Sequence, residues 1–85
     1  MKIDNKLGLH ARPAMLFVET ASKHIAAIKV RRTDQSEIVD GKSIMQMMML
    51  AATRGTELEI IADGPDAEEA VKCLAALIKA RFHED

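Results

Sequence analysis

The chain has 85 residues, of which 48% are hydrophobic and 29% charged, with a formal net charge of −1. This length fits a single domain over residues 1–85 and leaves too little chain for a deep, enclosed active site. The near-neutral charge, together with only two aromatic residues, argues against a nucleic-acid-binding protein. No apolar run is long enough to cross a bilayer and no export leader is visible, so we expect a cytoplasmic domain that does not insert into a membrane.

The first half of the chain predicts a helix followed by a hairpin. A helix is expected over residues 11–23, because Pro13 suits the first turn of a helix. A strand over 25–32, a polar turn over 33–36 and a return strand over 37–40 then form the predicted hairpin. Residues 1–5 are long enough for only a very short first strand. The buried side of the first helix is expected to contain Ala14, Phe17, Val18 and Ala21.

The second half predicts two more helices around one strand. Ser43 and Gln46 match the capping box that starts a helix, and Gly55 is a suitable stop signal just beyond a helix over 43–52. A strand is expected over 57–62. Asp66 and Glu69 then form a second capping-box pattern at the start of the last helix. The apolar stripe of that helix is expected to contain Val71, Leu74, Ala75, Ile78 and Phe82. Mixed helices and strands with a central hairpin indicate an α+β domain with an antiparallel sheet.

The start of the first predicted helix carries a histidine, within the segment GLHARPA at residues 8–14. Helix N-termini offer free N–H groups and a partial positive charge, which stabilise anions and favour a neutral, nucleophilic histidine ring. Arg12 adds a cation whose planar fork suits phosphate oxygens, and Gly8 permits a tight loop before the ring. The chemistry that this arrangement favours is a covalent phosphohistidine at His10. A surface histidine in an ordinary turn is the competing interpretation.

This segment resembles the phosphohistidine signature of the HPr family, the small phosphocarriers of the bacterial phosphoenolpyruvate-dependent phosphotransferase system (PTS). A second segment, GKSIM at residues 41–45, resembles the regulatory serine segment of the same family. The two segments are about thirty residues apart, as in the family, and the resemblance covers nearly the whole chain.

The resemblance implies a role for each matching residue. His10 corresponds to the histidine that enzyme I phosphorylates on Nδ1 and that passes the group to a histidine of an enzyme IIA domain. Arg12 corresponds to the arginine that steadies the phosphate, whose oxygens the backbone N–H groups of Ala11 and Arg12 would hold. Ser43 corresponds to the serine that HPr kinase/phosphorylase modifies in many Gram-positive bacteria. The chain would then be a monomeric phosphocarrier without a cofactor, a covalent intermediate rather than an enzyme.

The family fold implied by the resemblance is an open-faced β-sandwich of order β-α-β-β-α-β-α. It has a four-stranded antiparallel sheet with three helices on one face, and the predicted element order agrees with it. Two features depart from the family pattern. The first strand is short, and Gln46 stands where the family commonly has a glycine.

Four of the six methionines fall within residues 45–49. Met47 is expected on the core side of its helix, with Leu50 and Ala51. Ile44, Met45 and Met48 share another side, for which we predict partner docking, because methionine suits a surface that must fit several partners. The alternative is that every methionine fills the core. Ser43 also has a second interpretation, since serine is a good helix cap whether or not a kinase modifies it.

Other interpretations stay open on the sequence alone. One is a regulatory or nitrogen-branch carrier that acts mainly by phosphorylation-dependent protein binding. Another is an interaction module that uses the methionines, with an inert His10, and an RNA-binding module is weaker because aromatic residues are few. His24, Cys73 and His83 are too widely spaced to form a metal site, so none is expected.

Overall fold

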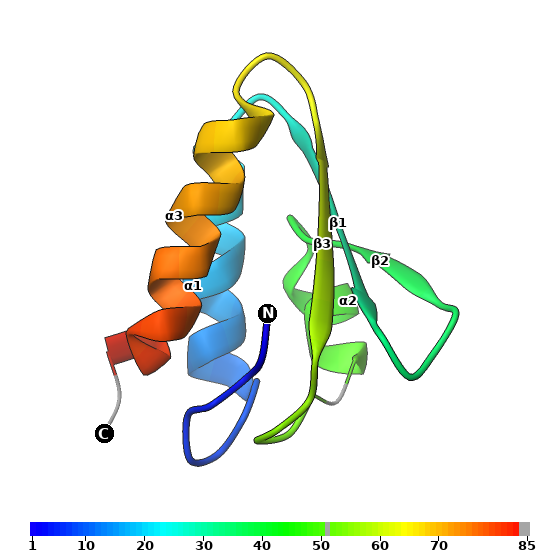
Figure 1. The fold of residues 1–85 in the computed structure, drawn as a ribbon, viewed down its shortest axis with the longest axis vertical. Coiled ribbons are helices and arrows are strands. Elements are labelled where there is room, and N and C mark those ends of the chain that lie inside the picture. The colour runs from blue at the N-terminus through cyan, green and yellow to red at the C-terminus, as the bar shows by residue number, and fades with distance from the viewer. Residues whose placement is uncertain (51, 84–85) are drawn as a thin grey trace.

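Residues 1–50 and 52–83 are described by a computed structural model of the chain. Their elements follow the predicted order from the first helix onwards and confirm an α+β domain (Figure 1). The elements are α1 (Ala11–Ser22), β1 (Ala27–Arg32), β2 (Ile38–Asp40), α2 (Ile44–Met49), β3 (Leu58–Asp63), α3 (Ala67–Lys79) and the 3-10 turn η1 (Arg81–His83).

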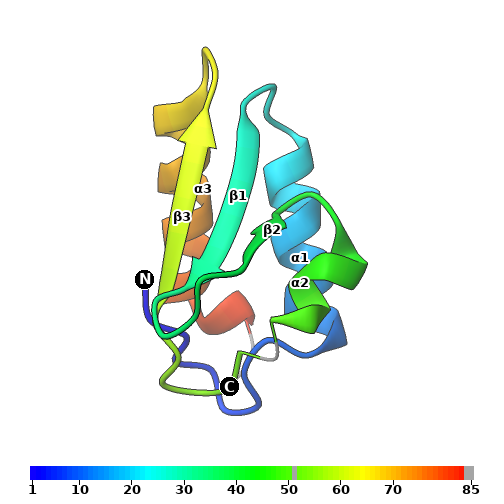
Figure 2. The same cartoon turned by 90° about the vertical axis from the view of Figure 1, so that its right-hand side faces the viewer.

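The sheet is antiparallel, with the strand order β2-β1-β3 (Figure 2). Val30 of β1 is paired with Val39 of β2 on one side and with Ile60 of β3 on the other. The predicted hairpin is therefore confirmed. Its first strand begins later than expected, at Ala27, and Ile25 is 80% exposed in the loop before it.

The four-stranded sheet expected from the resemblance is not formed by the described residues, whose sheet has three strands. The N-terminal segment adds only an isolated antiparallel bridge between Lys2 and Glu57. Ile3 donates a backbone hydrogen bond to Thr56 and accepts one from Gly55, at 2.9 and 2.7 Å. The segment meets β3 only at the strand's first residue, where Met1 and Leu58 exchange two hydrogen bonds of 2.6 Å, and the chain turns away over residues 5–8.

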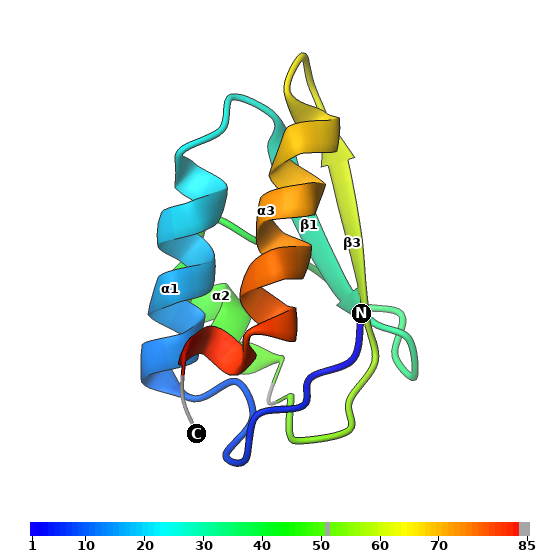
Figure 3. The ribbon, with the colours of Figure 1, turned by 60° about the vertical axis from the view of Figure 1, so that its left-hand side comes forward.

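The helices α1 and α3 lie side by side over one face of the sheet (Figures 1 and 3), while α2 packs against α1 and β2. Phe17 of α1, Val30 of β1 and Leu74 of α3 are fully buried between these layers. Because the strands alternate, Lys29 and the other side chains facing away from the helices are more exposed. The core is therefore one sheet face covered by two long helices.

The apolar faces of the helices agree with the predictions only in part. Val18 of α1 is half-buried rather than buried. The buried side of α3 is rotated slightly from the expected stripe, since Val71 and Ala75 are half-buried. The side chains that α3 and η1 bury are Ala70, Leu74, Leu77, Ile78 and Phe82.

The second capping box, at the start of α3, is wrong. Asp66 is the N-cap residue, but its side chain makes no capping hydrogen bond. Its carboxylate instead accepts hydrogen bonds from the N–H groups of Ile25 and Ala26, at 2.9 and 2.8 Å. These two donors hold the pKa of the Asp66 carboxyl below its usual range. A contact between the start of α3 and the loop before β1 has replaced the local one.

The helix α2 is shorter than predicted and ends at Met49. Gly55 lies six residues further on, and its φ of +93° places it in the turn between Thr53 and Thr56 rather than at the end of the helix. The prediction for Ala51 lies outside the described residues. None of the helices in residues 1–50 and 52–83 has the length and apolar character needed to cross a bilayer.

Candidate phosphohistidine site

His10 is the N-cap residue of α1, as the sequence predicts. Its backbone is extended, with φ −86° and ψ −170°, and its side chain is half-buried and makes no capping hydrogen bond. The ring therefore does not satisfy the donors of its own helix. This position places an imidazole beside the positive end of a helix of 12 residues.

The first turn of α1 leaves two N–H groups without a partner inside the helix. Intrahelical bonding begins where the Ala14 N–H donates to the His10 carbonyl, at 2.9 Å. Pro13 has no N–H to offer, so Ala11 and Arg12 carry the open donors. His10, these two donors and Arg12 all lie at the start of α1. Such a set suits an anion with several oxygens.

The loop before His10 is held by the segment that follows α2. Gly8 has a φ of +71°, and a Cβ on it would lie 2.6 Å from the Ala52 carbonyl oxygen and 2.7 Å from the Thr53 Cα. The Leu9 N–H donates to that same Ala52 carbonyl at 2.7 Å. The need for glycine at position 8 is confirmed, but its cause is the 52–53 segment rather than the histidine ring. The contact of residues 52–53 with Gly8 and Leu9 was not predicted from the sequence. The turn signal at Gly55 marks a loop in that region but does not show what the loop contacts.

The same loop is closed on itself by Asn5, which is fully buried. The Asn5 side-chain amide donates to the Gly8 carbonyl at 2.6 Å, and the Gly8 N–H donates to the Asn5 carbonyl at 3.1 Å. Two hydrogen bonds between the same pair of residues make a compact turn. The turn delivers Leu9, which is buried, and then His10 to the start of α1.

Arg12 lies in the first turn of α1 with an exposed side chain. Within residues 1–50 and 52–83 it forms no ion pair, whereas Arg54 and Arg81 both lie near the Asp4 carboxylate, at 3.7 and 3.2 Å. A guanidinium in this setting can turn towards an anion bound at the helix start without first breaking a carboxylate contact.

Ser43 occupies the N-cap position of α2, which confirms the predicted cap. Its Oγ accepts a hydrogen bond from the Gln46 N–H at 3.3 Å. The other half of the predicted box is wrong, because the Gln46 side chain accepts from the Asp40 N–H at 2.8 Å instead of from Ser43. The Ser43 N–H donates to the Asp40 carbonyl. Gln46, where the family commonly has glycine, therefore links α2 to the end of β2.

The methionines of α2 divide as predicted, with one addition. Met47 is fully buried, whereas Met45 and Met48 are 76% and 46% exposed. Ile44 is half-buried and packs in part against the core. Met49 is 67% exposed and lies one helical turn from Met45, so it extends the exposed side. The spacing of four between Met45 and Met49 is the signal that sequence reasoning did not use.

The chain is similar to proteins of one known family. The family described as "PTS HPr component phosphorylation site" matches residues 1–80 of the chain. The phosphocarrier protein HPr of Pseudomonas aeruginosa is 49% identical over 82 residues, which cover 96% of this chain and 90% of the relative. The chain belongs to the HPr family.

Two further proteins are similar to this HPr-family chain over its full length. The phosphocarrier protein NPr of Klebsiella oxytoca is 38% identical over 85 residues, covering all of this chain and 93% of the relative. The crystal structure of HPr-C-His from Thermoanaerobacter tengcongensis superposes with a TM-score of 0.93 at 46% identity, covering 100% of this chain and 93% of that one. The family-level function follows: this HPr-family chain is a phosphocarrier of the PTS and not an enzyme. That role implies enzyme I and enzyme IIA domains as its partners in general.

His24 and Cys73, two of the residues considered for a metal site in this HPr-family chain, lie near the end of α1 and on α3. The His24 Nδ1 lies 3.0 Å from the Thr20 carbonyl at the end of α1, and the Lys42 ammonium donates to the His24 carbonyl at 2.7 Å. Cys73 is half-buried on α3. No group of three or more His, Cys, Asp or Glu side chains in the described part of the chain could hold a metal ion.

Proposed function

We propose that His10 is the residue of this phosphocarrier that is phosphorylated, on Nδ1, by phospho-enzyme I, and that it passes the group to a histidine of an enzyme IIA domain. The observation that carries this proposal is the position of His10 at the start of α1, beside two N–H groups without partners inside the helix. In the proposal the carrier works in the cytoplasm, since the relay begins with phosphoenolpyruvate.

The transfer is a displacement at phosphorus. A neutral His10 ring attacks the phosphorus, a new N–P bond forms, and the bond between phosphorus and enzyme I breaks. The N–H groups of Ala11 and Arg12 and the Arg12 guanidinium bind the phosphoryl oxygens. These fixed donors stabilise charge that moves during the transfer without having to reorganise. The same contacts would release the group when an acceptor histidine approaches.

Incubation with phosphoenolpyruvate and enzyme I, followed by mass measurement, tests the proposal. We expect an acid-labile gain of about 80 Da, the mass of one phosphoryl group, in the wild type and none in His10→Ala. His24→Ala and His83→Ala are matched controls, since each removes another histidine of the same chain, and both should gain the mass. An adduct on the His10→Ala chain, or none on the wild type, would overturn the assignment.

We further propose that Ile44, Met45 and Met48 form the surface that meets these partners. Met45 and Met48 expose apolar side chains on α2, beside the buried side of that helix. A methionine thioether adapts its shape to different partners. A charge at Met45 or Met48 should then slow transfer from enzyme I without unfolding the domain. Ile61→Glu is a control, because Ile61 is 40% exposed on a strand of the sheet. Wild-type transfer by Met45→Glu and Met48→Glu would end the docking role.

We also propose that Ser43 is a regulatory phosphorylation site for HPr kinase/phosphorylase. Its side chain is half-exposed, and a phosphate at a helix N-terminus is favoured electrostatically, so modification would alter the surface while keeping the helix. The test incubates the chain with ATP and HPr kinase/phosphorylase and maps the product. Phosphate on Ser43 supports the role, and an unmodified Ser43 contradicts it.

We propose the sugar branch of the PTS rather than the nitrogen branch, and a monomeric carrier. HPr relatives match the chain at 45–49% identity, compared with 36–38% for NPr relatives. Parallel assays with enzyme I and with its nitrogen-branch counterpart test the first point, and faster transfer from the counterpart would reverse it. Analytical ultracentrifugation tests the second, and a stable dimer would contradict it.

A further inference from the structure

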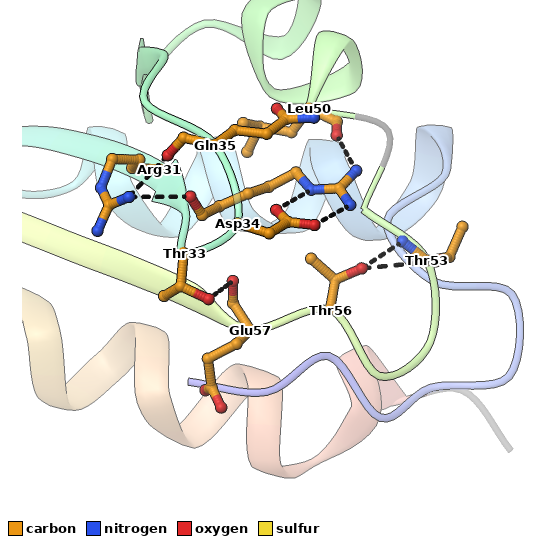
Figure 4. Close-up of polar contacts among 9 residues, drawn as sticks. Arg31, Thr33, Asp34, Gln35, Leu50, Thr53, Thr56 and Glu57 are labelled. Atoms are coloured by element: carbon orange, nitrogen blue, oxygen red, sulfur yellow. Dashed lines mark hydrogen bonds and ion pairs between the residues drawn. The ribbon is translucent and has the colours of Figure 1, made fainter.

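A polar cluster at the end of β1 lies outside the site described above. The Arg32 guanidinium makes two hydrogen bonds with the Asp34 carboxylate, at 3.0 and 2.9 Å, and its Nη1 donates to the Leu50 carbonyl at 3.0 Å. Figure 4 shows Asp34 and Leu50 with these contacts. Asp34 holds the guanidinium from one side, which leaves it oriented towards α2. One arginine thus connects the hairpin to the end of a helix.

The Leu50 carbonyl is the C-cap carbonyl of α2. The last carbonyls of a helix have no partner inside it and carry partial negative charge, so a cation there satisfies and stabilises them. This matters more than usual here, because α2 has only six residues and a helix of that length is not stable alone. Arg32 therefore stabilises the C-terminal end of α2.

Residues 52–53 support the histidine loop. Two residues beyond Leu50, the Ala52 carbonyl accepts the Leu9 N–H at 2.7 Å, and Ala52 and Thr53 lie so near Gly8 that a Cβ there would meet their backbone atoms at 2.6 and 2.7 Å. The Thr53 N–H is itself held by the Thr56 Oγ1 at 3.1 Å (Figure 4). A displacement of Leu50 would move the carbonyl on which Leu9, the residue before His10, depends.

We propose that Arg32 is a positioning residue for phosphoryl transfer. In the proposal it acts at a distance, through its contact with Leu50 and through the bond between Ala52 and Leu9, to place the imidazole relative to the first N–H groups of α1. This inference rests on the proposed role of His10. Errors in placement are costly in transfer reactions, where a shift of about 1 Å can lower a rate by about a hundredfold.

Arg31 supplies a matched control on the same strand. Its guanidinium also pairs with a carboxylate, that of Glu59 at 3.0 Å, and also donates to carbonyls, those of Arg32 and Gln35. In contrast to the Arg32 contacts, these Arg31 contacts all lie within the sheet and hairpin. Arg31→Met thus removes a comparable set of contacts without touching the end of α2.

The experiment measures transfer from phospho-enzyme I as a function of carrier concentration, at a temperature where every variant is folded. For Arg32→Met we expect the maximal rate to fall about tenfold with a half-saturating concentration within about twofold of wild type. Arg32→Lys, which can reach one partner but lacks the fork, should recover part of the rate. Arg31→Met should transfer at the wild-type rate.

Amide shifts give a second readout that does not require transfer. In Arg32→Met the ¹H–¹⁵N signals of Leu9 and His10 should move, and in Arg31→Met they should not. A wild-type maximal rate together with unmoved Leu9 and His10 signals in Arg32→Met would overturn the positioning role, even if the variant were less stable. If the wild-type chain itself accepted no phosphoryl group, the proposed role of His10 would fail instead, while the amide shifts would still report the connection.

Discussion

The helices α1 and α2 each begin at a residue proposed for phosphorylation, His10 and Ser43, but the two helix starts are built differently. At α2 the Ser43 side chain caps the helix, with its Oγ 3.3 Å from the Gln46 nitrogen. At α1 the His10 side chain makes no capping bond, and two N–H groups stay without partners inside the helix. The α2 start is capped by its own side chain, whereas the α1 start keeps two donors for the phosphoryl group in the proposed function. The two residues occupy the same N-cap position, and only Ser43 uses its side chain to cap its helix.

The supports of the two starts differ as well. The α1 start depends on contacts distant in sequence, in which Gly8 and Leu9 rest on residues 52–53. The α2 start is held by residues nearby, with Asp40 bonded to both Ser43 and Gln46. A change far from His10 in sequence can therefore reach the α1 start, whereas the α2 start depends on its own neighbourhood.

The largest effect is expected for Gly8→Ala, which should disturb the α1 start. The added Cβ meets backbone atoms at 2.6 and 2.7 Å, and the φ of +71° is strained for alanine. We expect the free energy of unfolding to fall by about 3 kcal/mol and transfer to slow with it. Gly55→Ala is the control, since its φ is also positive but nothing lies within 4 Å of the added atom. Urea unfolding that shows equal losses for both variants would contradict the role given to residues 52–53.

Arg12→Gln should lower transfer at the α1 start without changing stability. Removing a charged donor to the phosphoryl oxygens is expected to slow acceptance from enzyme I about tenfold. Its exposed side chain forms no ion pair within the described residues, so the unfolding curve should not move. Arg54→Gln, which removes another exposed arginine, should transfer normally. An equal slowing in both variants would point to general charge rather than to Arg12.

Ser43→Ala should lower the stability of the domain at the α2 start without slowing phosphoryl transfer. Loss of the cap is expected to cost about 1 kcal/mol of unfolding free energy, and Ser43→Gly only a few tenths. Transfer from enzyme I to His10 should be unchanged in both. Stability equal to wild type in Ser43→Ala would show that the cap hydrogen bond contributes nothing measurable.

The smallest effect concerns acid stability at a third helix start, that of α3. Hydrogen bonds from Ile25 and Ala26 lower the pKa of Asp66 in the folded chain. Its stabilisation is therefore present above the unfolded pKa of about 3.9 and is lost as the pH falls through the lower folded pKa. In Asp66→Asn the unfolding free energy should change less with pH below about 4 than in wild type. Identical pH profiles would show that the Asp66 carboxylate does not contribute to the acid dependence of stability.

The sequence predicted the features that depend on local pattern. Helical spacing located Phe17 and Met47 in the core, and the serine before residue 44 predicted the α2 cap. The position of His10 at a helix start also followed from the residues around it. These features are set within one or two turns of chain, where a pattern carries the information.

The misses share a different cause, which is competition from distant partners. Asp66 and Gln46 could each have made a local bond, but Asp66 binds N–H groups 40 and 41 residues away and Gln46 reaches back to the end of β2. The support of Gly8 by Ala52 was invisible for the same reason. Local capping patterns do not show which tertiary donors will be closer once the chain has folded.

The most direct test of the comparison follows the amide signals of both helix starts while the chain is phosphorylated by enzyme I. We expect the ¹H–¹⁵N signals of Ala11 and Arg12 to shift downfield by more than any others outside residues 5–10, while that of Gln46 stays in place. Phosphorylation that leaves the Ala11 and Arg12 signals unmoved would contradict the claim that the open donors of α1 hold the phosphoryl group.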